Sequence, residues 1–217
     1  MIKNKTDLLS NDLSKSSFNL RKTAITALEK IIKALRPENL IKNNVRLKSS
    51  TLFVQNSSFD LIKVNKIYII GGGKATLEMV CAFEQNILKN INNPYKGIIN
   101  IPKNQKDKEY GLSEKIIVNY ASHPVPDKNG VKGVKAMLNM VEGAKQNDLI
   151  ISFISGGGSS LLPLPRESIS LKDLKRVNSL LLASGASIHE INAIRKHLSG
   201  FKGGNLAKRI HKSSGAT

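Results

Sequence analysis

The sequence predicts an α/β domain with a Rossmann-like, three-layer arrangement in which helices cover both faces of a mainly parallel sheet. Two short apolar runs rich in β-branched residues, at 66–70 and 149–154, have the length and composition of buried parallel strands. Each run ends in glycines and is followed by a helical pattern. Strands and helices that alternate in this way are typical of a parallel sheet, which binds ligands beyond the carboxyl ends of its strands.

The N-terminal part is expected to hold one amphipathic helix. Apolar residues recur at helical spacing over 18–35, Ser16 or Ser17 can cap the start, and Pro37 marks the end. Residues 1–17 are polar and rich in Asn, Ser and Lys, and we expect them to form a flexible arm.

Residues 38–60 indicate an irregular polar connection with one or two short strands, at 45–47 and 51–54. Further on, Ser170-x-x-Asp173 and Ser187-x-x-Glu190 have the spacing of helix capping boxes. The other elements expected are, in chain order, a strand at 66–70, a helix over 77–88, strands at 97–101 and 115–119, a helix over 131–141, a strand at 149–154, helices over 170–183 and 187–198, and a helix from about residue 205.

Composition narrows the class of protein. Forty per cent of the 217 residues are hydrophobic, which is enough for a core, and the single cysteine, Cys81, excludes an internal disulfide framework. The chain has no run of roughly 18 apolar residues and no apolar segment near its start, so we expect a cytoplasmic protein without a membrane partner.

The net charge of +18 raises the question of nucleic-acid binding. The lysines are spread along the whole chain, few aromatic residues lie between them, and no known nucleic-acid motif is present. We therefore expect a solvated basic surface, or an acidic partner segment outside this chain, and no nucleic-acid partner.

A glycine-rich turn follows the strand at 149–154. Ser155, three glycines, Ser159 and Ser160 lead into the next helix, and such a turn lets backbone N–H groups approach an anion. A structural turn is the alternative, and the Gly-x-Ser-x-Gly pattern of a hydrolase is not met. The sequence predicts a phosphate- or carboxylate-binding site here.

Lys74 follows three glycines at the end of the other apolar run. The spacing is not that of a Walker P-loop, so the choice lies between a phosphate-facing ammonium group and an exposed lysine in an ordinary turn. The third candidate is a basic cluster formed by Arg195, Lys196 and Lys202. It is either a further contact for an anion or the solvated end of a helix.

His123 lies in a loop with two prolines, and Asp127 is expected to cap the helix that follows. No spacing of His, Cys, Asp and Glu resembles a zinc site, and no metal ligand is predicted. Together these signals favour a phosphorylated ligand.

Four segments together resemble the glycerate 2-kinase family, ATP-dependent kinases whose second half is the MOFRL domain. The matching segments are GGGKAT (71–76), ASHPVPD (121–127), DLIISFISGGGSSLLPLP (148–165) and ASGASIHEINAIRKHLSGFKGGNLA (183–207). The resemblance implies transfer of the ATP γ-phosphoryl group to the 2-hydroxyl of D-glycerate, with Mg²⁺.

The resemblance also implies roles for residues. Lys74 matches the family's conserved lysine and is the catalytic candidate, stabilising charge on the phosphoryl group. The residues expected to bind substrate or phosphate are Gly72, Gly73, Ser155, Gly156, Gly157, Gly158, Ser159, Ser160, Arg195, Lys196, Lys202, His123 and Asp127.

Two alternatives stay open. One is a nucleotide- or anion-binding module without catalysis. The other is a hydroxypyruvate reductase, an older label of the family, although the dinucleotide fingerprint Gly-x-Gly-x-x-Gly is not met.

The family's chains are longer than this one. The resemblance implies that residues 18–217 are the N-terminal α/β domain, incomplete at its C-terminal end, and that the MOFRL domain is absent. We therefore expect the chain alone to be a poor catalyst that works as a homodimer or with a separate C-terminal domain chain.

Overall fold

Four parallel strands form the centre of the computed structural model, which describes residues 2–10, 14–106 and 111–214. Their order across the sheet is β6-β5-β4-β7, and every neighbouring pair is parallel. The α/β class with a parallel sheet is thus confirmed. The strands are β4 (Ile67–Gly72), β5 (Tyr95–Pro102), β6 (Ile116–Ala121) and β7 (Leu149–Ile154).

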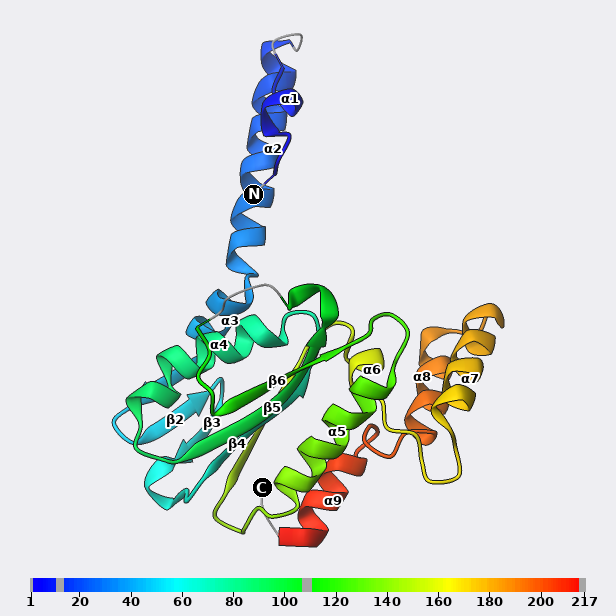
Figure 1. Ribbon diagram of the computed structural model, residues 1–217. Coiled ribbons are helices and arrows are strands. Elements are labelled where there is room, and N and C mark those ends of the chain that lie inside the picture. The colour runs from blue at the N-terminus through cyan, green and yellow to red at the C-terminus, as the bar shows by residue number, and fades with distance from the viewer. Residues whose placement is uncertain (1, 11–13, 107–110, 215–217) are drawn as a thin grey trace.

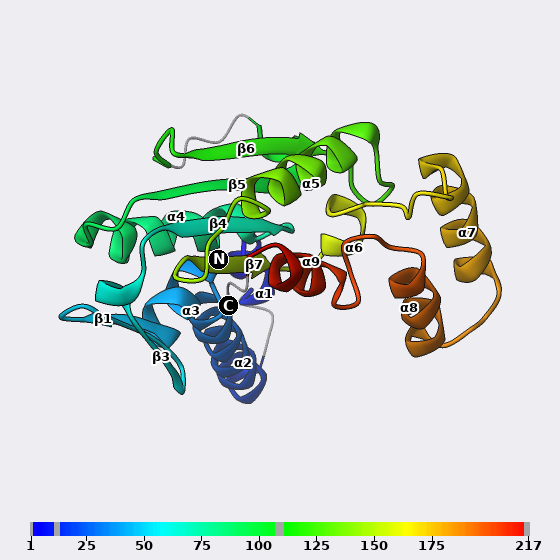
Figure 2. The same ribbon diagram turned by 90° about the horizontal axis from the view of Figure 1, so that it is seen from below.

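Helices cover both faces of this sheet, which gives the three predicted layers (Figures 1 and 2). On one face lies α4 (Thr76–Asn86) with α3 (Pro37–Asn44) beyond it, and on the other lie α5 (Lys128–Val141) and α9 (Asn205–Ser214). All six residues of β4 are buried, because the strand is central and covered on both sides.

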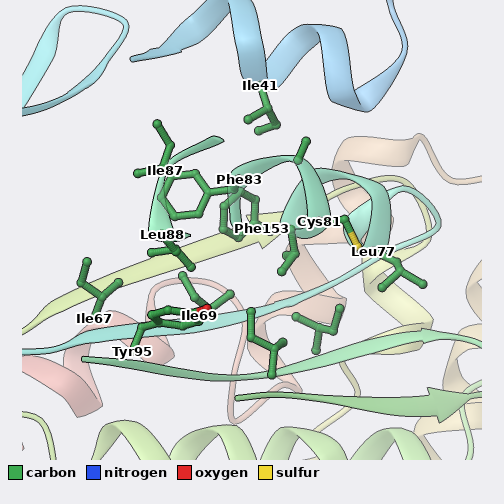
Figure 3. Packing of buried hydrophobic residues seen from close by; sticks show 14 of the residues in the cluster. Ile41, Ile67, Ile69, Leu77, Cys81, Phe83, Ile87, Leu88, Tyr95 and Phe153 are labelled. Atoms are coloured by element: carbon green, nitrogen blue, oxygen red, sulfur yellow. The ribbon is translucent and has the colours of Figure 1, made fainter. Parts of the chain in front are cut away.

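The core on the α4 face is built mainly from aliphatic side chains, together with the rings of Phe83, Phe153 and Tyr95 (Figure 3). The rings of Phe83 on α4 and Phe153 on β7 lie 5.2 Å apart between centroids. Cys81 is buried in the same cluster, and burial, followed by the charges of Glu84 and Glu78, raises the pKa of its thiol to about 11.

The N-terminal region differs from the prediction. Helix α2 (Lys15–Ala34) is capped by Ser14, whose hydroxyl accepts from the Ser17 N–H, and not by Ser16 or Ser17. A short helix α1 (Lys5–Leu8) lies in the predicted arm, and Lys5 pairs with Glu29 of α2 at 2.6 Å. Residues 1 and 11–13 of the arm, and 215–217 at the other end of the predicted domain, lie outside the described residues.

Residues 38–60, expected to be mostly irregular, are largely ordered as regular elements. Pro37 occupies the first turn of helix α3, where its fixed φ suits a helix start. The two predicted strands are present, and a third completes an antiparallel meander with the order β1-β2-β3. These strands are β1 (Val45–Lys48), β2 (Thr51–Val54) and β3 (Ser57–Asp60).

Three helices lie beyond the carboxyl ends of the strands. The short α6 (Gly158–Leu161) continues the glycine turn after β7, whereas α7 (Leu171–Ala183) and α8 (Ile188–His197) form a pair that stands away from the sheet (Figure 2). Both predicted capping boxes, which start α7 and α8, are formed. Short 3₁₀ turns cover Leu61–Lys63, Leu88–Asn90 and Lys103–Gln105.

None of the helices in the described ranges combines the length and apolar character needed to cross a bilayer.

Candidate functional site

The two glycine-rich turns meet at the carboxyl edge of the sheet, where β4 and β7 run side by side. The Lys74 N–H donates to the Gly156 carbonyl at 2.8 Å, and the Ala75 N–H donates to the Ser155 hydroxyl at 3.0 Å. The Thr76 hydroxyl lies 3.1 Å from the same Ser155 oxygen. Ser155 therefore links the turns to each other, and its hydroxyl is engaged by protein groups.

Close packing explains glycine at two positions in these turns. A Cβ on Gly73 would lie 2.0 Å from the Ser155 hydroxyl oxygen. Gly157 has a φ of +88°, and a Cβ there would lie 2.9 Å from His123 Cδ2 and 3.4 Å from Lys74 Cγ. The His123 ring and the Lys74 side chain thus pack against Gly157 from two sides.

Lys74 borders an open hollow of about 410 Å³, named here the Lys74 hollow. Its side chain is exposed, and its carbonyl accepts from Gln105 Nε2 at 2.7 Å. Among the described residues Lys74 forms no ion pair, so its exposed ammonium group can bind a phosphate group without first breaking one. The hollow is lined by Lys74, Pro102, Lys103, Asn104, Gln105, Ala121, Ser122 and His123.

Lys103 and Asp127 form an ion pair next to this hollow. Lys103 Nζ lies 2.7 Å from Asp127 Oδ2, and the Ser122 hydroxyl donates to the same oxygen at 2.9 Å. Asp127 Oδ1 accepts from the Gly130 N–H, so the predicted cap of α5 is present. Burial acts to raise the pKa of Asp127, but the hydrogen bonds from Lys103, Gly130 and Ser122 outweigh it and lower the pKa to about 2.

A second, more enclosed cavity of about 360 Å³ lies between the 123–126 loop, α6 and the α7–α8 pair. We call it the Arg195–Lys202 cavity. Lys202 Nζ donates to the Leu162 carbonyl at 2.6 Å, and Arg195 Nε donates to Asn178 Oδ1 at 2.9 Å. Burial and then the nearby Arg195 charge lower the pKa of Lys202 to about 8. The lining residues are His123, Pro124, Val125, Pro126, Gly157, Ser159, Ser160, Leu174, Lys175, Asn178, Ser179, Leu182, Arg195, Ser199 and Lys202.

His123 borders both the Lys74 hollow and the Arg195–Lys202 cavity. Burial of the ring and, second, the charge of Lys74 lower the pKa of His123 below its usual value. The lowered pKa favours the neutral imidazole, which can accept a hydrogen bond.

A buried asparagine fixes the spacing of these parts. Asn100, at the end of β5, donates to the carbonyls of Gly130 in α5 and Leu161 in α6, at 3.0 and 2.6 Å. Its own oxygen accepts from Asn119 of β6 at 2.8 Å. One side chain thus ties the start of α5 and the glycine-turn helix to the sheet.

The structure brings together most of the predicted site residues. Lys74, His123, Gly157, Ser159, Ser160, Arg195 and Lys202 line the two adjoining cavities. Ser155 and Gly158 line a third hollow on the far side of the glycine turn, together with Lys202. Gly72 and Gly73 are buried backbone positions, and Gly156 is exposed.

Lys196 is not brought to these cavities, because it is exposed on a different face of α8 from Arg195. Other residues that line these cavities were not predicted from the sequence. Lys103 lies two residues after the predicted strand at 97–101, and this position near a strand end is a signal that could have found it. Asn178 and Lys175 gave no such signal, because their place depends on how α7 folds back over the glycine turn.

The described residues do not fit the magnesium ion that the resemblance implies. No group of three or more His, Cys, Asp or Glu side chains comes together within the described ranges. Asp127, which is bonded to two residues of the Lys74 hollow, is already engaged by Lys103, Ser122 and Gly130. In phosphoryl-transfer sites Mg²⁺ is usually held by one or two carboxylates together with waters and substrate phosphates, and the engaged Asp127 carboxylate does not offer a free ligand of that kind.

Comparison with protein families gives one match over most of the chain. Residues 23–217 match a family model described as "Domain of unknown function (DUF4147)".

Among curated proteins, the chain is 38% identical over 197 residues to a Pyrococcus horikoshii protein named "Glycerate 2-kinase", and 35% identical over 196 residues to a Thermotoga maritima protein named "D-glycerate 2-kinase". These alignments cover 89% and 88% of this chain but 42% and 41% of the relatives. The chain thus spans about two fifths of their length.

A solved structure from Pyrococcus horikoshii OT3 has a similar fold. It superposes with a TM-score of 0.74 at 38% sequence identity, over 88% of this chain and 41% of the other.

Proposed function

The chain belongs to the DUF4147 family, the N-terminal domain of glycerate kinases, and on this basis we propose that it forms the N-terminal part of a glycerate 2-kinase. In the proposed reaction, the 2-hydroxyl oxygen of D-glycerate forms a bond to the γ-phosphorus of ATP as the bond to the β–γ bridging oxygen breaks. The products are 2-phosphoglycerate and ADP, and the hydroxyl proton is released.

One observation carries this proposal. The two glycine-rich turns come together around Lys74, which is held by its own N–H to the Gly156 carbonyl and packs beside Gly157 and His123. Phosphoryl transfer depends mainly on positioning and on stabilising negative charge. A fixed backbone with a solvent-facing ammonium group is suited to that task.

The residues have separate tasks in the proposal. Lys74 stabilises negative charge on the phosphoryl group as it is transferred. Ser159, at the start of α6, is exposed and lines the Arg195–Lys202 cavity, where its hydroxyl can donate to an anionic oxygen. The Ser160 hydroxyl donates to the Gly157 carbonyl at 3.1 Å and so holds the turn. ATP as donor and D-glycerate as acceptor are the substrates of this proposed reaction.

Phosphorus NMR of the chain with Mg-ATP and D-glycerate tests the proposal directly. The chain is measured alone and joined to the portion of its relatives that lies outside the alignment. We expect 2-phosphoglycerate from the joined protein and less or none from the chain alone. ATP binding without product from either protein would leave the non-catalytic binding module in place of the kinase, and NADH oxidation by hydroxypyruvate would favour the reductase.

The substitution Lys74→Met, made in the joined protein, tests the role of this residue. Because Lys74 is exposed, we expect unchanged folding by circular dichroism and a fall in kcat of about 100-fold or more. Lys208→Met, which removes the same charge from the exposed face of α9, is the matched control. Turnover within about twofold of the unmodified protein in Lys74→Met would overturn the role given to Lys74.

A further inference from the structure

Three cationic residues line the Arg195–Lys202 cavity, Lys175, Arg195 and Lys202, and the last two are neighbours without an anionic partner among the described residues. Their hydrogen bonds go to neutral groups, the Leu162 carbonyl and the Asn178 amide oxygen. Within the described ranges neither residue forms an ion pair, and none of the residues that line the cavity is acidic. Two partly buried positive charges side by side repel each other, and an anion between them would relieve that repulsion.

The walls of this cavity indicate what kind of anion fits. Pro124, Val125, Leu174 and Leu182 line the same cavity and give it apolar surface. A bare inorganic anion gains nothing from such a wall, whereas an organic acid places its carbon atoms against it. The arginine fork also matches the two oxygens of a carboxylate.

The cavity is separate from the hollow at Lys74. The packed pair of His123 and Gly157 stands between them, and His123 borders both. A carboxylate held by Arg195 and Lys202 would leave the rest of a short acid facing this boundary. The acid's hydroxyl group would then point toward the side on which Lys74 lies.

We propose that the Arg195–Lys202 cavity binds the carboxylate of a short 2-hydroxy acid, and that it selects such acids over uncharged polyols. The inference rests on the proposed function for the identity of the acid and names the part of the site that recognises it. The transferred phosphoryl group, in this arrangement, stays on the Lys74 side of the His123–Gly157 pair.

Binding measurements on the 217-residue chain test the inference. D-Glycerate is titrated into the ¹⁵N-labelled chain up to about 20 mM, a range that detects millimolar affinity. We expect saturable shifts of Gly157, Ser159 and the Arg195 side chain, and none of this kind with glycerol, which has the same carbon skeleton without the carboxylate. Equal shifts with glycerol, or no saturable shifts with glycerate, would overturn the inference without any need for a variant.

Variants then assign the binding to the two cations. Arg195→Met and Lys202→Met should each weaken D-glycerate binding by about tenfold or more. Arg176→Met and Lys208→Met remove the same charges from exposed positions outside the cavity and should change the affinity less than about twofold. An equal loss in all four variants would show a general charge effect and contradict a built subsite.

Inorganic phosphate separates the two kinds of anion. We expect it to bind more weakly than D-glycerate at this cavity and to lose little affinity in Arg195→Met. The opposite result, with phosphate losing affinity and glycerate unaffected, would assign the cavity to phosphate and overturn the carboxylate.

A failure of the carboxylate subsite and a failure of the proposed kinase function give different results. Glycerate binding that depends on Arg195 and Lys202, without any 2-phosphoglycerate, would remove the kinase and leave the subsite. Normal turnover with an unchanged KM for glycerate in both variants would remove the subsite and leave the kinase.

Discussion

Gly73 and Gly156 are neighbouring positions of the two glycine turns with opposite surroundings. A Cβ on Gly73 would collide with the Ser155 hydroxyl, and its φ of +155° is rarely adopted by other residues, whereas a Cβ on Gly156 would meet nothing within 4 Å. We expect Gly73→Ala to lower the free energy of unfolding by about 2–4 kcal/mol and Gly156→Ala to lower it by less than about 1 kcal/mol. Urea denaturation of both variants measures the difference.

Equal destabilisation by the two substitutions would contradict the close contact between Gly73 and Ser155. Both glycines belong to runs of three in the sequence, and nothing in the sequence distinguishes them. The strand pairing of β4 with β7 decides which glycine is crowded.

Lys202 gives glycerate binding a predicted pH dependence. Its pKa of about 8 means that the side chain is charged below that pH and neutral above it, and the anion binds the charged form. We expect the affinity for D-glycerate to be highest below pH 8 and to fall above it toward the affinity of Lys202→Met, in which this charge is absent at every pH. Titrations at pH 7, 8 and 9 measure this dependence.

Lys202→Met is the control for this pH dependence. Affinity in that variant should be lower and independent of pH over the same range, because Arg195 stays charged throughout. A variant that keeps the full pH dependence would show that another group titrates.

At the scale of single residues, the sequence identified the groups whose signals are local. Lys74 and the glycines stand out because a strand ends beside them, and the Asp127 cap stands out because a helical pattern begins after it. Asn178 and Lys175 were missed, and Lys196 was included with Arg195, because neighbours in a helix face different directions and only the packed helix shows which one lines the cavity. Lys103 was also missed, although it lies near the end of a predicted strand.

Asn100 forms hydrogen bonds to α5, α6 and β6, so its replacement should weaken the packing of all three elements. In Asn100→Leu, the buried carbonyls of Gly130 and Leu161 lose their donor. We expect the free energy of unfolding to fall by about 3 kcal/mol, measured by urea denaturation. Asn90→Leu, at an exposed position where the amide bonds to a nearby helical carbonyl, should cost less than about 1 kcal/mol.

A loss in Asn100→Leu no larger than that in Asn90→Leu would contradict the linking role. The sequence analysis did not single out Asn100, which lies inside a strand prediction without a turn or charge beside it. Its importance comes from the close packing of α5, where a Cβ on Gly133 would lie 1.9 Å from the Asn100 oxygen.

Among whole elements, helices with capping signals and strands with apolar runs were predicted well. Helix α3 and strand β3 were missed, since residues 37–44 and 57–60 are short, largely polar and only partly buried. Tertiary contacts, such as those of Ile41 with the α4 cluster, stabilise elements that weak local signals do not reveal.

Across the whole molecule, stability should be unevenly distributed. Every residue of β4 is buried, whereas α2, α7 and α8 each have a single buried residue among those described. Hydrogen exchange followed by mass spectrometry should therefore show the slowest exchange in β4 and β5 and faster exchange in α2 and the α7–α8 pair. Uniform protection of all these elements would contradict this expectation.

The same experiment connects stability with the cavity. Because α7 and α8 supply one wall of the Arg195–Lys202 cavity, D-glycerate should slow exchange in these two helices and leave α2 unchanged. Slowing of α2 to the same extent would indicate an effect on the molecule as a whole.

The buried thiol of Cys81 has a practical consequence for spectroscopy. It is the chain's single cysteine, and its raised pKa and burial keep it from reacting with maleimides in the folded protein. A second cysteine introduced at the exposed residue Ser179, on the rim of the cavity, can therefore carry a fluorophore while Cys81 stays in place. A single substitution therefore makes site-selective labelling possible, and the fluorescence of the attached group can report ligand binding in the cavity.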